Sequence, residues 1–277
     1  MTAVKRQSGF HPNYEKFIIM TLFYLFFAGL FGLVFGSFLN VVIYRLPLGQ
    51  SIVFPASHCP KCGKPIKVFD NIPVLSYIIL RGKCRVCSEK ISPVYPFIEF
   101  FTGVLAVTFF ILNGFTLNFI SDFFLGAILL TAAMIDYRYM IIPDKLNIAG
   151  AIIGLILCFI RGSGGVIRGF EGAAAGFLIL TGMYLFGKII FKREGVGFGD
   201  VKLAAVIGLF VGPLWVFICM ANAIILGGII GTVLIISGRG KAGKEIPFGP
   251  FIAAGGIFML FFRAQILYLL GKYISLL

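Results

Sequence analysis

Long apolar runs constrain this chain more than any other feature of its sequence. The first extends from Phe17 to Ile43, and beyond residue 96 the chain is almost continuously apolar. Hydrophobic residues make up 59% of the 277 residues and charged residues only 13%, whereas a soluble domain is about 45–50% apolar and about 25% charged. One water-soluble core of this size could not bury so much apolar surface, which excludes an ordinary soluble enzyme, a disordered regulator and a fibrous protein. The sequence therefore predicts a polytopic membrane protein.

The membrane-spanning segments are predicted to be helices, because lipid offers the backbone no hydrogen-bond partners. The fold class is therefore all-α, with about eight transmembrane helices. The expected spans are residues 17–43, 97–112, 118–136, 146–160, 170–191, 201–218, 219–237 and 249–270. Three parts follow: an N-terminal segment with the first transmembrane helix (1–43), a polar four-cysteine module (44–96) and a transmembrane core (97–277).

The distribution of positive charge predicts the orientation of these helices. Cytoplasmic loops of membrane proteins are enriched in Lys and Arg. If the helices alternate from a cytoplasmic 44–95 loop, most of the 24 Lys and Arg residues fall on the cytoplasmic side. The opposite side holds Lys5, Arg6, Lys16, Arg161 and Arg168. The net charge of +13 is then explained by contact with an anionic membrane surface, and no nucleic-acid partner is expected.

Four of the six cysteines form two CxxC pairs in the polar module. Cys59 and Cys62 are followed, after 21 intervening residues, by Cys84 and Cys87. Four thiolates at this spacing predict a tetrahedral zinc site, and four protein ligands make the zinc structural rather than catalytic. Two disulfides are one alternative to the zinc site, and a reducing cytoplasm disfavours them. A redox-active CxxC is a second alternative. Cys158 and Cys219 lie in apolar spans, where packing is the expected role.

Two aspartates stand at predicted membrane boundaries, where ionisable side chains are costly and usually functional. Asp136 ends the third span, and Asp200 opens the sixth span after Gly197-Phe198-Gly199. The alternating topology brings both to the cytoplasmic face at the same depth. Two carboxylates that share a site hold one proton between them. Such a pair can hydrolyse a peptide bond, with one carboxylate activating water and the other protonating the carbonyl oxygen.

Simpler roles for these carboxylates stay open at this point. Asp136 could pair with Arg138, and Asp200 could cap a helix N-terminus, where Asp is favoured. Glu99, at the start of the second span, is a candidate for a buried proton carrier or for a polar contact between helices. A proton-coupled transporter that uses Asp136, Asp200 and Glu99 as a relay is the alternative function from another class.

At these residues the chain resembles the bacterial type IV prepilin peptidases, also called type II secretion leader peptidases, along nearly its whole length. Six motifs carry the resemblance in one order, together with the two CxxC pairs. They are the stretch from Gly36 to Pro47, Asn71-Ile72-Pro73, Tyr95-Pro96-Phe97-Ile98-Glu99, the Asp136 segment through Ile142-Pro143-Asp144, Gly197-Phe198-Gly199-Asp200, and Ile246-Pro247-Phe248-Gly249-Pro250.

The resemblance implies a bifunctional enzyme of the bacterial inner membrane. Such an enzyme cleaves the basic leader of prepilins or pseudopilins on the cytoplasmic side and then N-methylates the new N-terminal residue with S-adenosylmethionine. By position, Asp136 and Asp200 match the catalytic aspartates of the family, and the four-cysteine loop is characteristic of members that methylate. The alternative is a peptidase that removes the leader but does not methylate the new N-terminus. No Gly-rich nucleotide motif marks an S-adenosylmethionine site, and residues 44–99 are its expected region.

Overall fold

The chain is described by a computed structural model that covers residues 12–190, 196–237 and 246–274. Within these ranges the chain is mainly helical and contains no β-strand. The long helices are α1 (Pro12–Arg45), α3 (Val94–Asn113), α4 (Leu117–Tyr139), α5 (Asp144–Ile160), α6 (Ser163–Ile190), α7 (Phe198–Val211), α8 (Pro213–Ile236) and α9 (Gly249–Ile274). Between α1 and α3 lie the short 3-10 turn η1 (Val68–Asp70) and the short helix α2 (Leu75–Ile79).

Six of the described helices, α1, α3, α4, α6, α8 and α9, are long and apolar enough to cross a membrane. The two others are shorter, since α5 has 17 residues and α7 has 14. At 1.5 Å per residue α7 extends about 21 Å, less than the roughly 30 Å of a hydrocarbon core. The predicted all-helical, multi-pass membrane protein is confirmed, whereas the count of eight spans is not.

The boundary between α7 and α8 differs from the predicted one. The predicted boundary within residues 201–237 follows residue 218, but the helix breaks at Gly212. Gly212 has a φ of +84°, which favours glycine, and Pro213 begins α8 because a proline has no N–H to donate within a preceding helix. Gly212 and Pro213 were the better signal for this boundary than the length of the apolar run.

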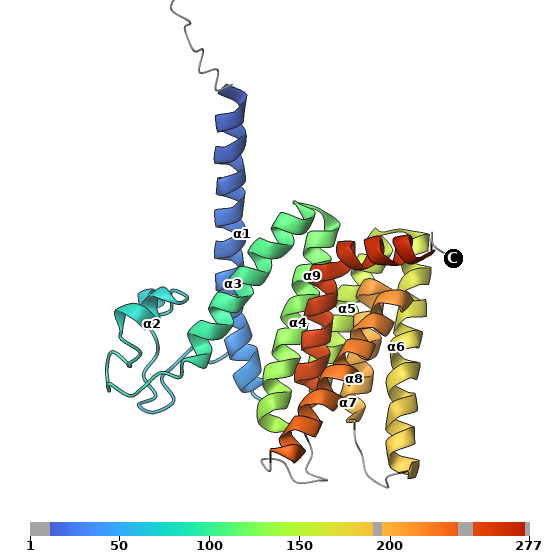
Figure 1. Cartoon of the computed structure of the whole chain (residues 1–277). Coiled ribbons are helices and arrows are strands. Elements are labelled where there is room, and N and C mark those ends of the chain that lie inside the picture. The colour runs from blue at the N-terminus through green and yellow to red at the C-terminus, as the bar shows by residue number, and fades with distance from the viewer. Residues whose placement is uncertain (1–11, 191–195, 238–245, 275–277) are drawn as a thin grey trace, which may run out of the picture.

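Helix α1 packs along α3, and its N-terminal part extends beyond the bundle formed by α4 to α9 (Figure 1). Two glycines of α1 allow the close approach. A Cβ at Gly32 would lie 2.6 Å from the backbone oxygen of Thr102, and a Cβ at Gly36 would lie 2.7 Å from the Cα of Glu99. Small residues spaced by four on α1 therefore let the two helices approach closely.

Helix α4 lies at the centre of the bundle and contacts α1, α3, α5, α7 and α9. Its C-terminal end and the N-terminal ends of α7 and α9 lie at one edge of the molecule, and the segment that carries α2 lies towards the same edge beside α1 and α3 (Figure 1). Some of the charges used in the orientation argument lie outside the described residues, namely Lys5, Arg6, Lys192, Arg193, Arg239, Lys241 and Lys244.

Candidate functional site

Asp136 lies in the last turn of α4 with only 5% of its surface exposed. The helix ends three residues later at Tyr139, where Met140 adopts a φ of +56° and its N–H donates to the backbone oxygen of Asp136. Its side chain does not pair with Arg138. Instead, the Oδ2 atom accepts a hydrogen bond of 2.7 Å from the backbone N–H of Gly249, the first residue of α9. The carboxylate is therefore fixed by a helix that begins 113 residues later in the chain.

Asp200 occupies the first turn of α7 and is 6% exposed. Its Oδ2 atom accepts a hydrogen bond of 3.0 Å from the N–H of Gly197, the N-cap residue. Asp200 is therefore the third residue of the helix and not its N-cap, and its contact with the N-cap residue uses one oxygen only. The Oδ1 atom is buried and receives no hydrogen bond from the described part of the chain. This oxygen is available to a reactant.

The two aspartates come together although 64 positions separate them in the sequence. The charge of Asp136 acts electrostatically on Asp200, and the helices that carry them are in contact. Two buried carboxylates that share a site disfavour the ionisation of both. A pair of this kind can offer one proton donor and one proton acceptor.

The turn between α4 and α5 supports the start of α7. A Cβ at Gly199 would lie 3.0 Å from the Cβ of Ile142 and 3.1 Å from its backbone oxygen, so this glycine is needed for close packing. The Nδ2 atom of Asn147 donates to the backbone oxygen of Gly199 at 3.3 Å. Gly197 itself has an ordinary extended backbone, with φ −74°. The Gly-x-Gly sequence therefore serves close approach, while the unusual backbone angles that it would permit are absent.

The four cysteines of the polar module form one cluster. The sulfur atoms of Cys59, Cys62, Cys84 and Cys87 all lie within 4.8 Å of one another, and those of Cys59 and Cys87 are 3.8 Å apart. A tetrahedral ion with metal–sulfur bonds of about 2.3 Å requires sulfur atoms about 3.8 Å apart. All four are free thiols rather than disulfides, so the cluster fits a tetrahedral metal ion.

The two CxxC segments share one backbone design. In the first, the N–H of Cys59 donates to the oxygen of Lys64, and in the second the N–H of Cys84 donates to the oxygen of Glu89. These turns direct backbone N–H groups towards sulfur. The N–H groups of Cys87 and Val86 lower the pKa of the Cys84 thiol to about 7, which favours the thiolate that binds metal ions.

Glu99 is placed on α3, facing the cysteine module. Its Oε2 atom accepts a hydrogen bond of 2.7 Å from the backbone N–H of Val74, next to α2. The structure therefore does not bring Glu99 together with the aspartate pair, as a three-carboxylate relay would require. The contact of Gly249 with Asp136 was not predicted, although the motif from Ile246 to Pro250 contains this glycine.

Two family models match the chain and together include most of it. One, described as the bacterial peptidase A24 N-terminal domain, matches residues 30–112. The other, described as the type IV leader peptidase family, matches residues 123–232. The first match includes the cysteine cluster and Glu99, and the second includes both aspartates.

Curated proteins named prepilin leader peptidase/N-methyltransferase are similar to the chain over most of its length. One from Burkholderia pseudomallei (strain 1026b) is 36% identical over 276 residues, covering 89% of this chain and 88% of the relative. Another from Dichelobacter nodosus is 34% identical over 289 residues, covering 92% and 98%. One from Myxococcus xanthus (strain DK1622) is 37% identical over 219 residues, covering 79% and 65%. No solved structure matches the chain.

Proposed function

This chain belongs to the type IV leader peptidase family, and we propose that it removes the leader peptide of prepilins or pseudopilins and then methylates the new N-terminus. The observation that carries the peptidase proposal is the pair of buried, electrostatically coupled carboxylates of Asp136 and Asp200 at one edge of a helical membrane bundle. The methylation proposal rests on its curated relatives, which are named for both activities.

Cleavage proceeds by direct attack of water on the peptide carbonyl. The ionised aspartate takes a proton from the water, whose oxygen bonds to the carbonyl carbon, while the protonated aspartate donates to the carbonyl oxygen. The carbon–nitrogen bond then breaks, and a proton moves from the dyad to the leaving amine. The N–H of Gly249 keeps the Asp136 side chain oriented throughout, and Gly197 does the same for Asp200.

The aspartate edge of the molecule faces the cytoplasm in this proposal. Arg45, Arg138 and Lys145 lie at or next to helix ends on this edge, and the cysteine module adds further lysines and arginines. Positive charge of this kind is retained on the cytoplasmic side. A prepilin whose apolar helix lies in the bilayer would present the bond between leader and helix at the same interface. The membrane is then the bacterial inner membrane.

The cysteine cluster holds a structural zinc ion in this proposal. Its sulfur spacing suits tetrahedral coordination, and four protein ligands leave no position open for a substrate. The ion would supply crosslinks to a module that has little core of its own. Among its large apolar side chains, Val53, Phe54, Val68 and Phe69 are more than half exposed.

The experiment that tests the function uses the purified full-length protein and a purified prepilin, with and without S-adenosylmethionine. Mass spectrometry of the pilin should show loss of the leader in both reactions, and one added methyl group at the new N-terminus only with S-adenosylmethionine. An intact leader would contradict the peptidase. A cleaved pilin that never gains a methyl group would show that the protein is a peptidase without methyltransferase activity.

Replacing Gly249 by alanine should reduce cleavage by roughly tenfold or more, because a Cβ at this position would lie 2.9 Å from both the Cβ and the Oδ2 of Asp136. Such a contact must displace the carboxylate, and small displacements of reacting groups cost large factors in rate. Gly271→Ala in the same helix is the matched control, since nothing lies within 4 Å of its Cβ position. Initial rates of leader removal measure both variants, and equal rates would exclude the orienting role of Gly249.

A further inference from the structure

Asn147 is a buried polar residue on the face of α5 that packs against α7. Its side chain lies in the first turns of α5, and only 4% of the residue is exposed. The two helices approach closely along this face. A Cβ at Gly150 would lie 2.8 Å from Cγ1 of Val206, and a Cβ at Gly154 would lie 3.0 Å from Cε2 of Phe210. A polar side chain in such an interface is costly unless its polar atoms are paired.

Only one end of the Asn147 amide has a partner in the described part of the chain. The Nδ2 atom donates to the backbone oxygen of Gly199 at 3.3 Å. The Oδ1 atom is buried and accepts no hydrogen bond from the described residues. Exchanging the two ends of the amide would place one acceptor against another at Gly199, so the orientation of the amide is fixed. The unpaired end of Asn147 is therefore an acceptor.

A second unpaired acceptor belongs to the residue that follows Gly199. The Oδ1 atom of Asp200 is also buried and without a partner among the described residues. Four buried side-chain atoms of the described chain lack a partner, and two of them belong to Asn147 and Asp200. Buried atoms of this kind are rare and require a specific explanation. Two acceptors joined through one glycine indicate a ligand that supplies hydrogen-bond donors.

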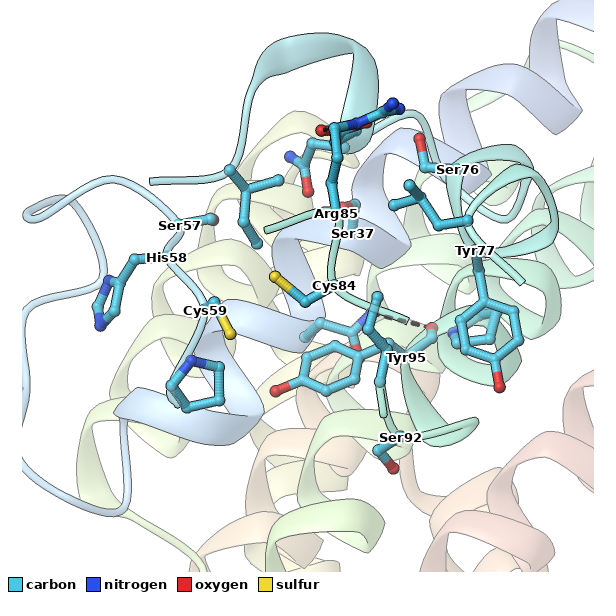
Figure 2. A pocket seen from close by; sticks show the side chains of 18 of the residues that line it. Ser37, Ser57, His58, Cys59, Ser76, Tyr77, Cys84, Arg85, Ser92 and Tyr95 are labelled. Atoms are coloured by element: carbon cyan, nitrogen blue, oxygen red, sulfur yellow. Dashed lines mark hydrogen bonds and ion pairs between the residues drawn. The ribbon is translucent and has the colours of Figure 1, made fainter. Parts of the chain in front are cut away.

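These two oxygens belong to the aspartate site and not to the cavity beside the cysteine module. That cavity has a volume of about 530 Å³, and Figure 2 shows Cys59, Cys84 and Tyr95 among the residues that line it. Neither Asn147 nor Asp200 is part of its lining. The ligand that completes the two acceptors is therefore one that reaches the aspartates, and in the proposed function this ligand is the prepilin chain.

An unwound peptide offers the donors that this site lacks. A peptide bond inside a helix has its N–H and C=O groups engaged in the helix, so the substrate must unwind where it is cut. Unwinding releases backbone N–H groups, one for each residue other than proline. At a membrane boundary such groups must find an acceptor in the protein. The Asn147 oxygen is suited to this task, because it is neutral and takes no part in proton transfer.

We propose that Asn147 binds the substrate backbone, with its Oδ1 atom accepting an N–H group of the unwound segment next to the scissile bond. This inference rests on the proposed peptidase function and adds a substrate-binding residue to its site. The Nδ2 atom meanwhile keeps its bond to Gly199, so one amide fixes both the substrate and the turn that carries Asp200. A contact with the backbone alone accepts substrates that differ in their side chains around the cut.

The test combines a substitution in the enzyme with a change in the substrate. The substrate is a synthetic prepilin peptide that contains the leader and the apolar helix. In a series of versions, one amide near the scissile bond is replaced by an ester, which has no N–H. With the unchanged full-length protein, one ester other than that at the scissile bond should lower kcat/KM about twofold to tenfold, the usual size of one hydrogen bond.

Asn147→Leu is the enzyme variant for this comparison, because leucine has a similar size and no polar atom. It should cleave the unmodified peptide more slowly, and the sensitive ester should cost nothing further, since the contact is already absent. Asn222→Leu is the matched control. The Nδ2 atom of Asn222 donates to the backbone oxygen of Ile218 within α8, so this variant should keep the full effect of the ester.

The outcomes distinguish a substrate contact from a structural role. If Asn147→Leu slows every substrate equally and keeps the effect of the ester, Asn147 only positions Gly199 and the inference is wrong. It is also wrong if no ester outside the scissile bond slows the unchanged protein, a result that does not depend on any variant. Asn147→Ala replaces Asn147→Leu if the larger side chain prevents folding. If the unchanged protein leaves the unmodified peptide intact, the proposed peptidase function itself fails.

Discussion

Asparagine at position 136 or at position 200 is expected to reduce leader cleavage by roughly a hundredfold or more, since general acid–base catalysis by a positioned side chain contributes about 10²–10⁴-fold. Either change removes a group that must both bind and release a proton. The fold should survive, because the asparagine oxygen can still accept from Gly249 at position 136 or from Gly197 at position 200. Initial cleavage rates of the purified variants provide the measurement.

Asp144→Asn is the matched control for this experiment. Asp144 stands at the same edge, at the start of α5, but it is exposed and pairs with Lys202 at 2.6 Å. Exposed ion pairs contribute little, so this variant should cleave nearly as fast as the unchanged protein. Normal cleavage by Asp136→Asn or by Asp200→Asn would remove that residue from the proposed dyad. Methylation of a pilin already cleaved should continue in both variants, because the amine acceptor no longer depends on the aspartates.

Loss of one cysteine of the cluster should abolish methylation and leave leader cleavage largely intact. Cys84→Ser should lower the zinc content from about one ion per chain to nearly none, since a structural site needs its four ligands. Methylation should then be lost, because the metal holds together the four-cysteine loop, which is characteristic of the methylating members that the chain resembles. Leader cleavage should largely persist, because Asp136 and Asp200 belong to the helical bundle.

Cys158→Ser controls for the loss of any thiol. Cys158 is buried in α5, and its thiol donates to the backbone oxygen of Leu209, a bond that a serine hydroxyl can also form. Elemental analysis should find the same zinc content in this variant as in the unchanged protein. A Cys84→Ser protein that keeps its zinc, or that loses cleavage together with methylation, would contradict the separate roles of the module and the bundle.

Features that depend on local pattern could be predicted from the sequence. Apolar runs of helical length predicted a helical membrane protein, and the paired CxxC segments predicted a four-cysteine cluster; the structure confirms both. The number of spans could not be predicted in this way. Hydropathy alone does not distinguish α7, which has 14 residues, from a full span, because the apolar run continues across Gly212 into α8.

Contacts between segments that are far apart in the chain could not be predicted from the sequence pattern. The sequence placed Asp136 and Asp200 at one membrane face, yet nothing in it showed that the N–H of Gly249 would hold Asp136. Glu99 illustrates the same limit, because its partner Val74 lies in a loop without periodicity. The motifs had indicated that these segments matter, but not which atoms meet.

The sequence by itself determined that the chain enters the membrane, that its segments are helices and that four thiols gather outside the bundle. The first two features are local, because long apolar segments prefer lipid to water and every backbone N–H and C=O group in lipid must be paired. The third follows from the spacing of the two CxxC pairs. The tertiary structure alone decided which atoms hold these carboxylates, the N–H of Gly249 for Asp136 and the N–H of Val74 for Glu99. In lipid the apolar faces of helices gain little from meeting one another, so the close fit at residues such as Gly32, Gly36 and Gly249 selects one arrangement among many.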